Sequence, residues 1–176
     1  MKRICLLLTL LLSACAQGVP PLNFSVPDIS PSARKVPAEV KSITVALARA
    51  NEQETVFQPG QETLTPIWKV GLEEALNAAA IFRDDSSTKV AIAVKILKVN
   101  VPALGGDFTV TAAALYQVTD RATGSTLYSE RLETTGTTPL GFAFLGLARA
   151  REAVNRAVQA NIAKFIATVP NMTVPR

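Results

Sequence analysis

The sequence predicts a two-layer α+β domain: an antiparallel sheet of about four strands with two amphipathic helices on one face, in the order β-α-β-β-β-α. Two observations lead to this class. Residues 90–135 form three consecutive runs that alternate apolar and polar side chains and are joined by short turns, which is typical of an antiparallel meander. Segments 65–82 and 147–169 instead repeat apolar residues at helical spacing. Two such helices can cover one sheet face, so we expect a single domain over residues 41–169.

The first strand and the first helix follow from local patterns. In the stretch ITVALA at 43–48, aliphatic side chains alternate with smaller ones, which indicates a strand. Thr65 and Pro66 are typical of a helix start, with a hydroxyl cap followed by proline at the first position. Trp68 opens the apolar stripe of this helix, so we assign Trp68 to the core. The helix should end before the turn RDDSS at 83–87.

The remaining elements are three strands and a long helix. We expect the strands at 90–99, 108–118 and 125–135, with PALGGD and DRATG as the two turns between them. The last helix should run from about Leu147 to Val169 and end at Pro170, because proline cannot continue a helix. Residues 170–176 are expected to form a loose tail.

The amino terminus has the features of an export signal. Lys2 and Arg3 precede an apolar run at 4–12, which is too short to cross a bilayer, since a spanning helix needs about 20 residues. The run ends in Leu-Ser-Ala-Cys, which resembles the lipobox of bacterial lipoproteins. The resemblance implies removal of residues 1–14 and attachment of a diacylglyceryl group and an acyl chain such as palmitate to Cys15. The alternative is an ordinary signal peptide with an unrelated cysteine at the cut.

Residues 15–40 are expected to connect this anchor to the domain. Five prolines favour an extended chain, which would serve as a tether that lifts the domain off the membrane. The apolar residues Leu22, Phe24, Val26 and Ile29 leave a second possibility open, an extended arm lying on the domain. Ala16 follows the anchor, and by resemblance to enterobacterial lipoproteins this implies the outer membrane, with the domain facing the periplasm.

Composition excludes several classes of chemistry. The 176-residue chain has no histidine and two cysteines, of which Cys5 would leave with the signal peptide. Metal sites built on imidazole and histidine-dependent nucleophiles are therefore excluded, as is an intramolecular disulfide. Asp84 and Asp85 lack the alternating ligand spacing of a calcium loop. We expect no enzyme activity, metal or cofactor, and the scattered basic residues give no support for binding nucleic acid.

Three stretches carry a further family resemblance. ITVALAR, WKVGLEEALNAAAIF and ALYQVTDRATGSTLYSE, together with the lipobox, resemble the YajG-type lipoproteins and the auxiliary lipoproteins of envelope transport systems. The resemblance covers roughly residues 42–167 and rests on pattern and element order. It implies a non-catalytic role in the cell envelope and supplies no active-site residues.

The stretch TTPLGFAFLGLARAREA is the candidate binding site. Leu140, Phe142, Phe144 and Leu145 are concentrated beside two glycines, which suggests an exposed loop that docks onto a partner protein or dips into lipid. The alternative is that the last helix begins near Leu140 and buries these side chains in its first turns.

The function that fits these observations is a membrane-anchored binding or assembly accessory of an envelope complex, with an envelope protein as partner. The alternative is a carrier of lipid or another apolar ligand, because small side chains could leave room between the sheet and the helices. The alanines considered for such a space are Ala91, Ala93, Ala112, Ala113 and Ala114.

Overall fold

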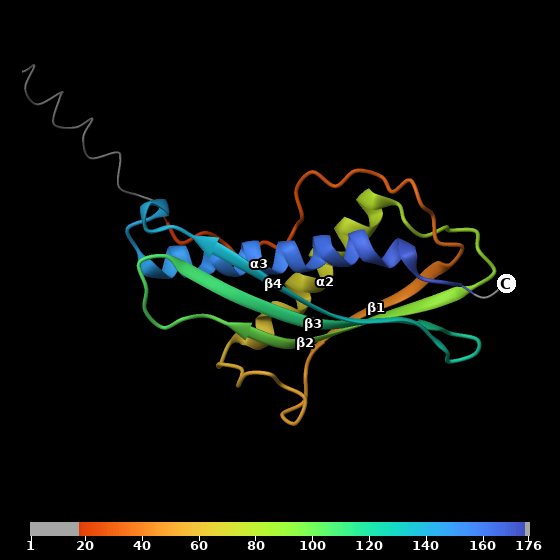
Figure 1. Cartoon of the computed structure of the whole chain (residues 1–176), viewed down its shortest axis with the longest axis horizontal. Helices are drawn as coiled ribbons and strands as arrows, with labels where there is room; N and C mark the ends of the chain where they lie inside the picture. Colours follow the sequence, from red (N-terminus) through yellow and green to blue (C-terminus); the bar gives the residue numbers. More distant parts are fainter. Residues whose placement is uncertain (1–17, 175–176) are drawn as a thin grey trace, which may run out of the picture.

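The computed structural model describes residues 18–174, so the predicted signal peptide (1–14) and the lipidation residue Cys15 lie outside the described residues. Strands and helices follow in the predicted order (Figure 1). They are β1 (Glu39–Leu47), α2 (Leu64–Ala79), β2 (Lys89–Asn100), β3 (Phe108–Asp120), β4 (Thr126–Thr138) and α3 (Gly146–Thr168), with short 3-10 turns η2 (Gln61–Thr63), η3 (Leu140–Phe142) and η4 (Val169–Asn171).

The predicted α+β class and element order are confirmed, and one strand pairing differs from the expectation. The sheet order is β1-β2-β3-β4, with antiparallel pairing for β2–β3 and β3–β4. β1 pairs with β2 in parallel, so the sheet is mixed rather than antiparallel throughout. The reason is the connection: α2 returns the chain to the starting end of β1, and a crossover of this kind yields parallel strands.

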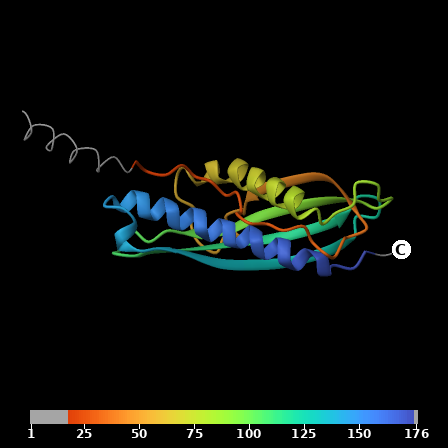
Figure 2. The same cartoon turned by 90° about the horizontal axis from the view of Figure 1, so that it is seen from above.

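Both helices lie on one face of the sheet and enclose the core between the two layers (Figure 2). Side chains alternate along β2 and β3, so that every second residue is buried beneath the helices. Trp68 is fully buried, as predicted, and its indole N–H donates to the hydroxyl of Tyr116 at 3.1 Å. Tyr116 in turn stacks on Phe165 of α3 with ring centroids 4.4 Å apart. This cluster links α2, β3 and α3.

Helix α3 lies unusually close to β4. A Cβ added at Gly136 would be 2.2 Å from the backbone nitrogen of Ala157 and 2.5 Å from the carbonyl oxygen of Ala153, so only glycine fits there. Asn161, which is completely buried, donates its side-chain amide to the carbonyl of Leu132 at 3.0 Å. These contacts fix the position of α3 along the sheet.

Residues 18–38 form an arm that packs on the helices, which is the second of the two possibilities left open by the sequence. Phe24 is 1% exposed and meets Trp68 edge-on, with centroids 6.1 Å apart. Asn155 of α3 donates to the carbonyl of Pro21 at 3.0 Å. A Cβ at Gly71 of α2 would approach the carbonyl oxygen of Phe24 to 2.5 Å. The prolines keep the arm extended, but its apolar side chains hold it on the domain.

Two chain segments differ in detail from the expectation. Helix α2 begins at Leu64 after a 3-10 turn, and the hydroxyl of Thr65 bonds to the carbonyl of Glu62 instead of capping the helix. The expected loose tail is packed through Val174, because Met172 is 8% exposed and belongs to the core. None of the helices within residues 18–174 is both long enough and apolar enough to span a membrane.

Candidate interaction site: the apolar end

Two loops meet at one end of the molecule, on the left in Figure 1. One joins β2 to β3 (101–107) and the other joins β4 to α3 (139–147), and we call them together the apolar end. The side chain of Asp107 accepts a hydrogen bond from the backbone N–H of Leu140 at 2.8 Å, which ties the loops together. Most of the large apolar side chains that are exposed on the described part of the chain lie here: Val101, Leu104, Leu140, Phe142, Phe144, Leu145 and Leu147.

The four residues predicted from sequence as a docking loop are all exposed to solvent. α3 begins only at Gly146, and the preceding Leu140–Phe142 forms a 3-10 turn, so these residues are not the buried first turns of the helix. Phe144 is 97% exposed. The sequence reasoning missed Leu104, which is 89% exposed and comes from the loop that was assigned only as a turn. A lone leucine between Pro102 and two glycines was the available signal.

A buried arginine supports the loop from beneath. Arg149 is 7% exposed, and its guanidinium donates to the carbonyls of Ala143 and Phe144 at 2.6 and 3.0 Å. It also lies 5.5 Å from the ring centroid of Phe108. No carboxylate within residues 18–174 forms an ion pair with it. Helical spacing alone could not show that the loop folds back over Arg149.

A second arginine holds the other side of the loop. The guanidinium of Arg156 lies 5.6 Å from the ring centroid of Phe142 and donates to the carbonyl of Thr137 at 2.8 Å. It is fixed in turn by Glu152, one helical turn earlier, at 2.8 Å. Arg149 therefore holds the loop backbone and Arg156 packs against the ring of Phe142, while Phe144 remains exposed.

The arm begins at the same end of the molecule. Its first described residues lie beside the start of α3 (Figures 1 and 2). Leu22 and Leu147 line one shallow surface pocket, and Pro21 bonds to Asn155 as described above. The arm thus runs from the apolar end toward the opposite end along α2 and α3.

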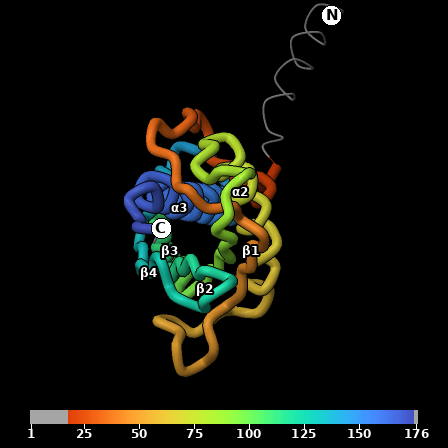
Figure 3. Tube along the Cα trace, turned by 90° about the vertical axis from the view of Figure 1, so that its right-hand side faces the viewer, coloured from red at the N-terminus to blue at the C-terminus, as the bar shows by residue number. Residues whose placement is uncertain are grey.

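A groove lies between β1 and α2 in the opposite half of the molecule. Figure 3 shows α2 beside β1 when the molecule is viewed end-on. The groove has a volume of about 470 Å³ and is lined by residues 40–43 of the strand, by Leu76 and Asn77 of the helix, and by Phe82. β1 is an edge strand with no fully buried residue, and its only strand partner among the described residues is β2.

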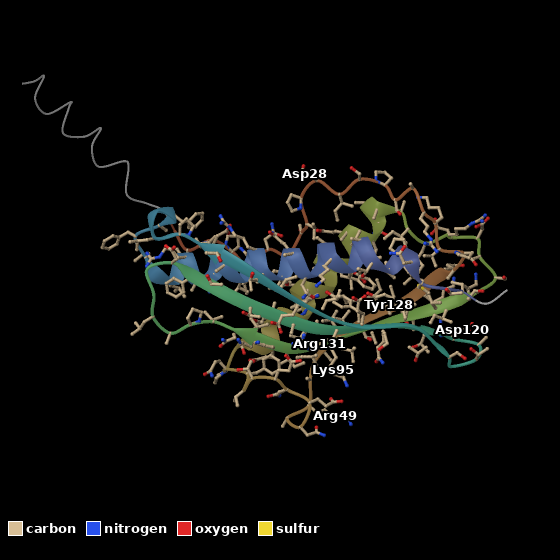
Figure 4. All side chains as sticks on the ribbon, viewed as in Figure 1. Asp28, Arg49, Lys95, Asp120, Tyr128 and Arg131 are labelled. Atoms are coloured by element: carbon tan, nitrogen blue, oxygen red, sulfur yellow. The ribbon has the colours of Figure 1, made fainter. Side chains whose placement is uncertain are left out.

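The outer face of the sheet is partly covered by the β1–α2 connection. Glu52 pairs with Lys95 of β2 at 2.5 Å, and Glu54 pairs with Arg131 of β4 (Figure 4). Arg131 holds the pKa of Glu54 below its ordinary value, and Lys95 does the same for Glu52. Ion pairs of this kind at the surface fasten the connection to the sheet without making a binding site.

The alanines considered for a ligand space do not share one cavity. Ala112 and Ala114 are completely buried beneath the helices, whereas Ala113 is buried on the other face under the β1–α2 connection. Ala91 and Ala93 alternate with the inward-facing residues of β2 and lie on the outer face. On the inner face, the space beside the alanines is filled by close packing of the helices on the sheet.

Comparison with known proteins gives the fold but no family. No family model matches the chain, and no curated protein matches it. Protein XCC0632 from Xanthomonas campestris, of family DUF330, aligns with a TM-score of 0.61 at 10% identity, over 84% of this chain and 93% of that one. Two further matches are protein CT253 from Chlamydia trachomatis (TM-score 0.49, 13% identity, 76% and 96% covered) and a minor lipoprotein from Acinetobacter baumannii (0.45, 11%, 74% and 92%). The match to XCC0632 shows that the two proteins share a fold.

Proposed function

We propose that this chain is a lipid-anchored, non-catalytic accessory of an assembly in the bacterial cell envelope. In this proposal the lipobox directs acylation of Cys15, residue 16 directs the protein to the outer membrane, and the domain faces the periplasm. The resemblance to YajG-type lipoproteins belongs to the same proposal. The accessory role consists in binding an extended segment of an envelope protein.

The observation that carries the proposal is the free edge of β1. An edge strand presents backbone N–H and C=O groups that have no partner in its own sheet, and another chain can pair with them. Just before β1, the chain segment that follows α2 pairs in this way with the segment that leads into the strand. The backbone N–H of Val36 donates to the carbonyl of Ile81 at 2.9 Å, and Val36 and Phe82 form a parallel bridge. This short segment leaves the sheet after Arg83, so residues 40–47 remain open where the groove begins.

The groove beside this edge supplies contacts for side chains. Leu76 and Phe82 offer apolar surface, whereas Lys41, Glu73 and Asp84 place charges of both signs around it. An added strand would direct alternate side chains toward the helix, where this surface lies. We therefore infer an extended segment with apolar and polar residues in alternation as the bound element.

Site-specific photocrosslinking in cells tests the proposal. A photoreactive amino acid replaces Ser42 on the exposed edge of β1 in the full-length chain, and Ser129 on β4, the other edge strand, serves as the matched control. Both side chains are exposed, so neither replacement should disturb the fold. We expect one dominant envelope protein crosslinked at residue 42 and absent at 129. No crosslinked protein at 42, or the same set at both positions, would contradict the proposal.

A further inference from the structure

We propose that the apolar end inserts into the surface of the bilayer that holds the acyl chains of Cys15, so that the domain stands on the membrane in one orientation. This inference rests on the acylation of Cys15 in the proposed function. It assigns the predicted docking loop to lipid and leaves the groove beside β1 for the protein partner.

The length of chain before the arm sets the distance to the bilayer. Cys15 precedes Gly18 by three residues, and an extended chain spans at most about 3.6 Å per residue, so the two are at most about 11 Å apart. The arm after Gly18 packs on α2 and α3 and does not act as a free spacer. Because the arm starts beside the apolar end, an acylated Cys15 holds that end next to the lipid (Figure 2).

The side chains of the apolar end suit the interfacial region of a bilayer. Phe144 and Leu104 are 97% and 89% exposed and come from different loops, so they form two contact points rather than one flexible tip. The loop that carries Phe144 is held by Arg149, which limits the ordering cost on insertion. Exposed apolar clusters on soluble domains mark contacts with proteins or membranes, and a second membrane contact strengthens a lipid anchor.

Charge at this end favours negatively charged lipid headgroups. Arg151 is partly exposed and has no ion-pair partner within residues 18–174, whereas Glu152 is neutralised by Arg156. Asp107 is the one acidic residue in the two loops, and it accepts the backbone N–H of Leu140. Arginine side chains near a bilayer interact favourably with anionic headgroups over a distance of about one Debye length.

Fluorescence quenching from within the bilayer tests the inference. The acylated full-length product is reconstituted into vesicles of phosphatidylethanolamine and phosphatidylglycerol, with a polarity-sensitive dye on Phe144→Cys, on Leu104→Cys, or on the control Ala122→Cys. Ala122 is exposed in the turn at the other end of the sheet. Lipids with a nitroxide near the headgroup should quench the dye at 144 and 104 at least threefold more than at 122. Replacing phosphatidylglycerol by phosphatidylcholine should reduce that difference.

The outcomes separate this inference from the proposed function. Intact mass of each variant reports acylation of Cys15 directly, and the near-ultraviolet signal of the buried Trp68 reports folding. If Cys15 is acylated and the protein folded, equal quenching at 144 and 122 overturns the inference while the anchor stands. A photocrosslinker at 144 that captures one protein in place of lipid overturns it as well. An unacylated Cys15 removes the anchor, and the inference then fails with it.

Discussion

The two ends of the sheet are closed by connections of opposite chemistry. The 101–107 loop between β2 and β3 exposes Leu104, whereas the turn between β3 and β4 at the other end is polar. Asp120 organises that turn by accepting the backbone N–H of Ala122 at 2.7 Å, and Gly124 supplies a positive φ of 74° (Figure 4). The residues of the β3–β4 turn are explained by what its backbone conformation needs, whereas the exposed Leu104 of the 101–107 loop is not.

The difference indicates which end makes contacts. Polar side chains and a left-handed glycine are what a short hairpin turn needs, so the composition of the polar end is accounted for by the turn itself. Leucine and phenylalanine at nearly full exposure contribute nothing to folding stability where they lie. Their side chains gain free energy only when something apolar covers them. This exposure is the reason for proposing that the apolar end contacts lipid.

The comparison depends on a fixed α3, and one substitution should displace it. Gly136→Ala would place a methyl group against the backbone of α3, so we expect a loss of about 3 kcal/mol in the free energy of unfolding, the upper end of the usual cost of overpacking. Chemical denaturation followed by circular dichroism measures it. Gly141→Ala, where a Cβ meets nothing within 4 Å, is the control and should change stability by less than about 1 kcal/mol. Similar values for both would mean that α3 can shift freely.

Removing the arginine beneath the loop should loosen the apolar end specifically. Arg149→Met leaves the carbonyls of Ala143 and Phe144 without their donor, so we expect a loss of about 1–3 kcal/mol. Amide exchange at 143–148 should accelerate more than exchange in β3. Arg121→Met in the polar turn should cost less than about 0.5 kcal/mol, because Arg121 is exposed. Unchanged exchange at 143–148 would show that the loop does not depend on Arg149.

Acid should affect the outer sheet face before the apolar end. Arg131 lowers the pKa of Glu54, and Lys95 lowers that of Glu52, below the ordinary value of 4.5. A lowered folded-state pKa gives stability that is complete above about pH 4.5 and is lost as the pH falls through the folded-state value. We therefore expect hydrogen exchange in residues 50–56 to rise below about pH 4, after correction for the intrinsic rate. Arg149 bonds to neutral carbonyls, so exchange at 143–148 should show no matching rise.

The smallest effect on stability is expected at Phe144. Since this side chain is almost fully exposed, Phe144→Ser should change the free energy of unfolding by less than about 0.5 kcal/mol. Thermal unfolding in detergent gives this value. A loss above about 2 kcal/mol would mean that Phe144 packs inside the protein and is not a contact residue. Phe108→Ser, at a residue 6% exposed, should by contrast cost several kcal/mol.

Most of the fold could be predicted because periodicity reports burial directly. Alternation in β2 and β3 and the helical stripe of Trp68 gave the layers and the core. The parallel pairing of β1 could not be read from its own pattern, since an edge strand alternates weakly whichever way it runs. The packed arm was also undecided, because proline predicts an extended chain but not what that chain lies against.

The candidate site was predictable only in part. The apolar composition of 140–145 was visible, but its exposure depends on Arg149 bonding back to the loop, which no sequence spacing shows. Leu104 joins the site only because the hairpin brings two loops together through Asp107 and Leu140. The groove beside β1 depends on strand order and on where α2 ends, so it had no signal in the sequence.

The most direct test of the account is the height of each end above the membrane. Energy transfer from a donor on Leu104→Cys or on Ala122→Cys to an acceptor at the lipid surface measures it in acylated protein on nanodiscs. α3 has 23 residues, and at about 1.5 Å per residue the helix is roughly 35 Å long, which separates the two positions well. If the apolar end inserts into the bilayer, transfer is strong from 104 and weak from 122. Equal transfer, or stronger transfer from 122, would contradict it.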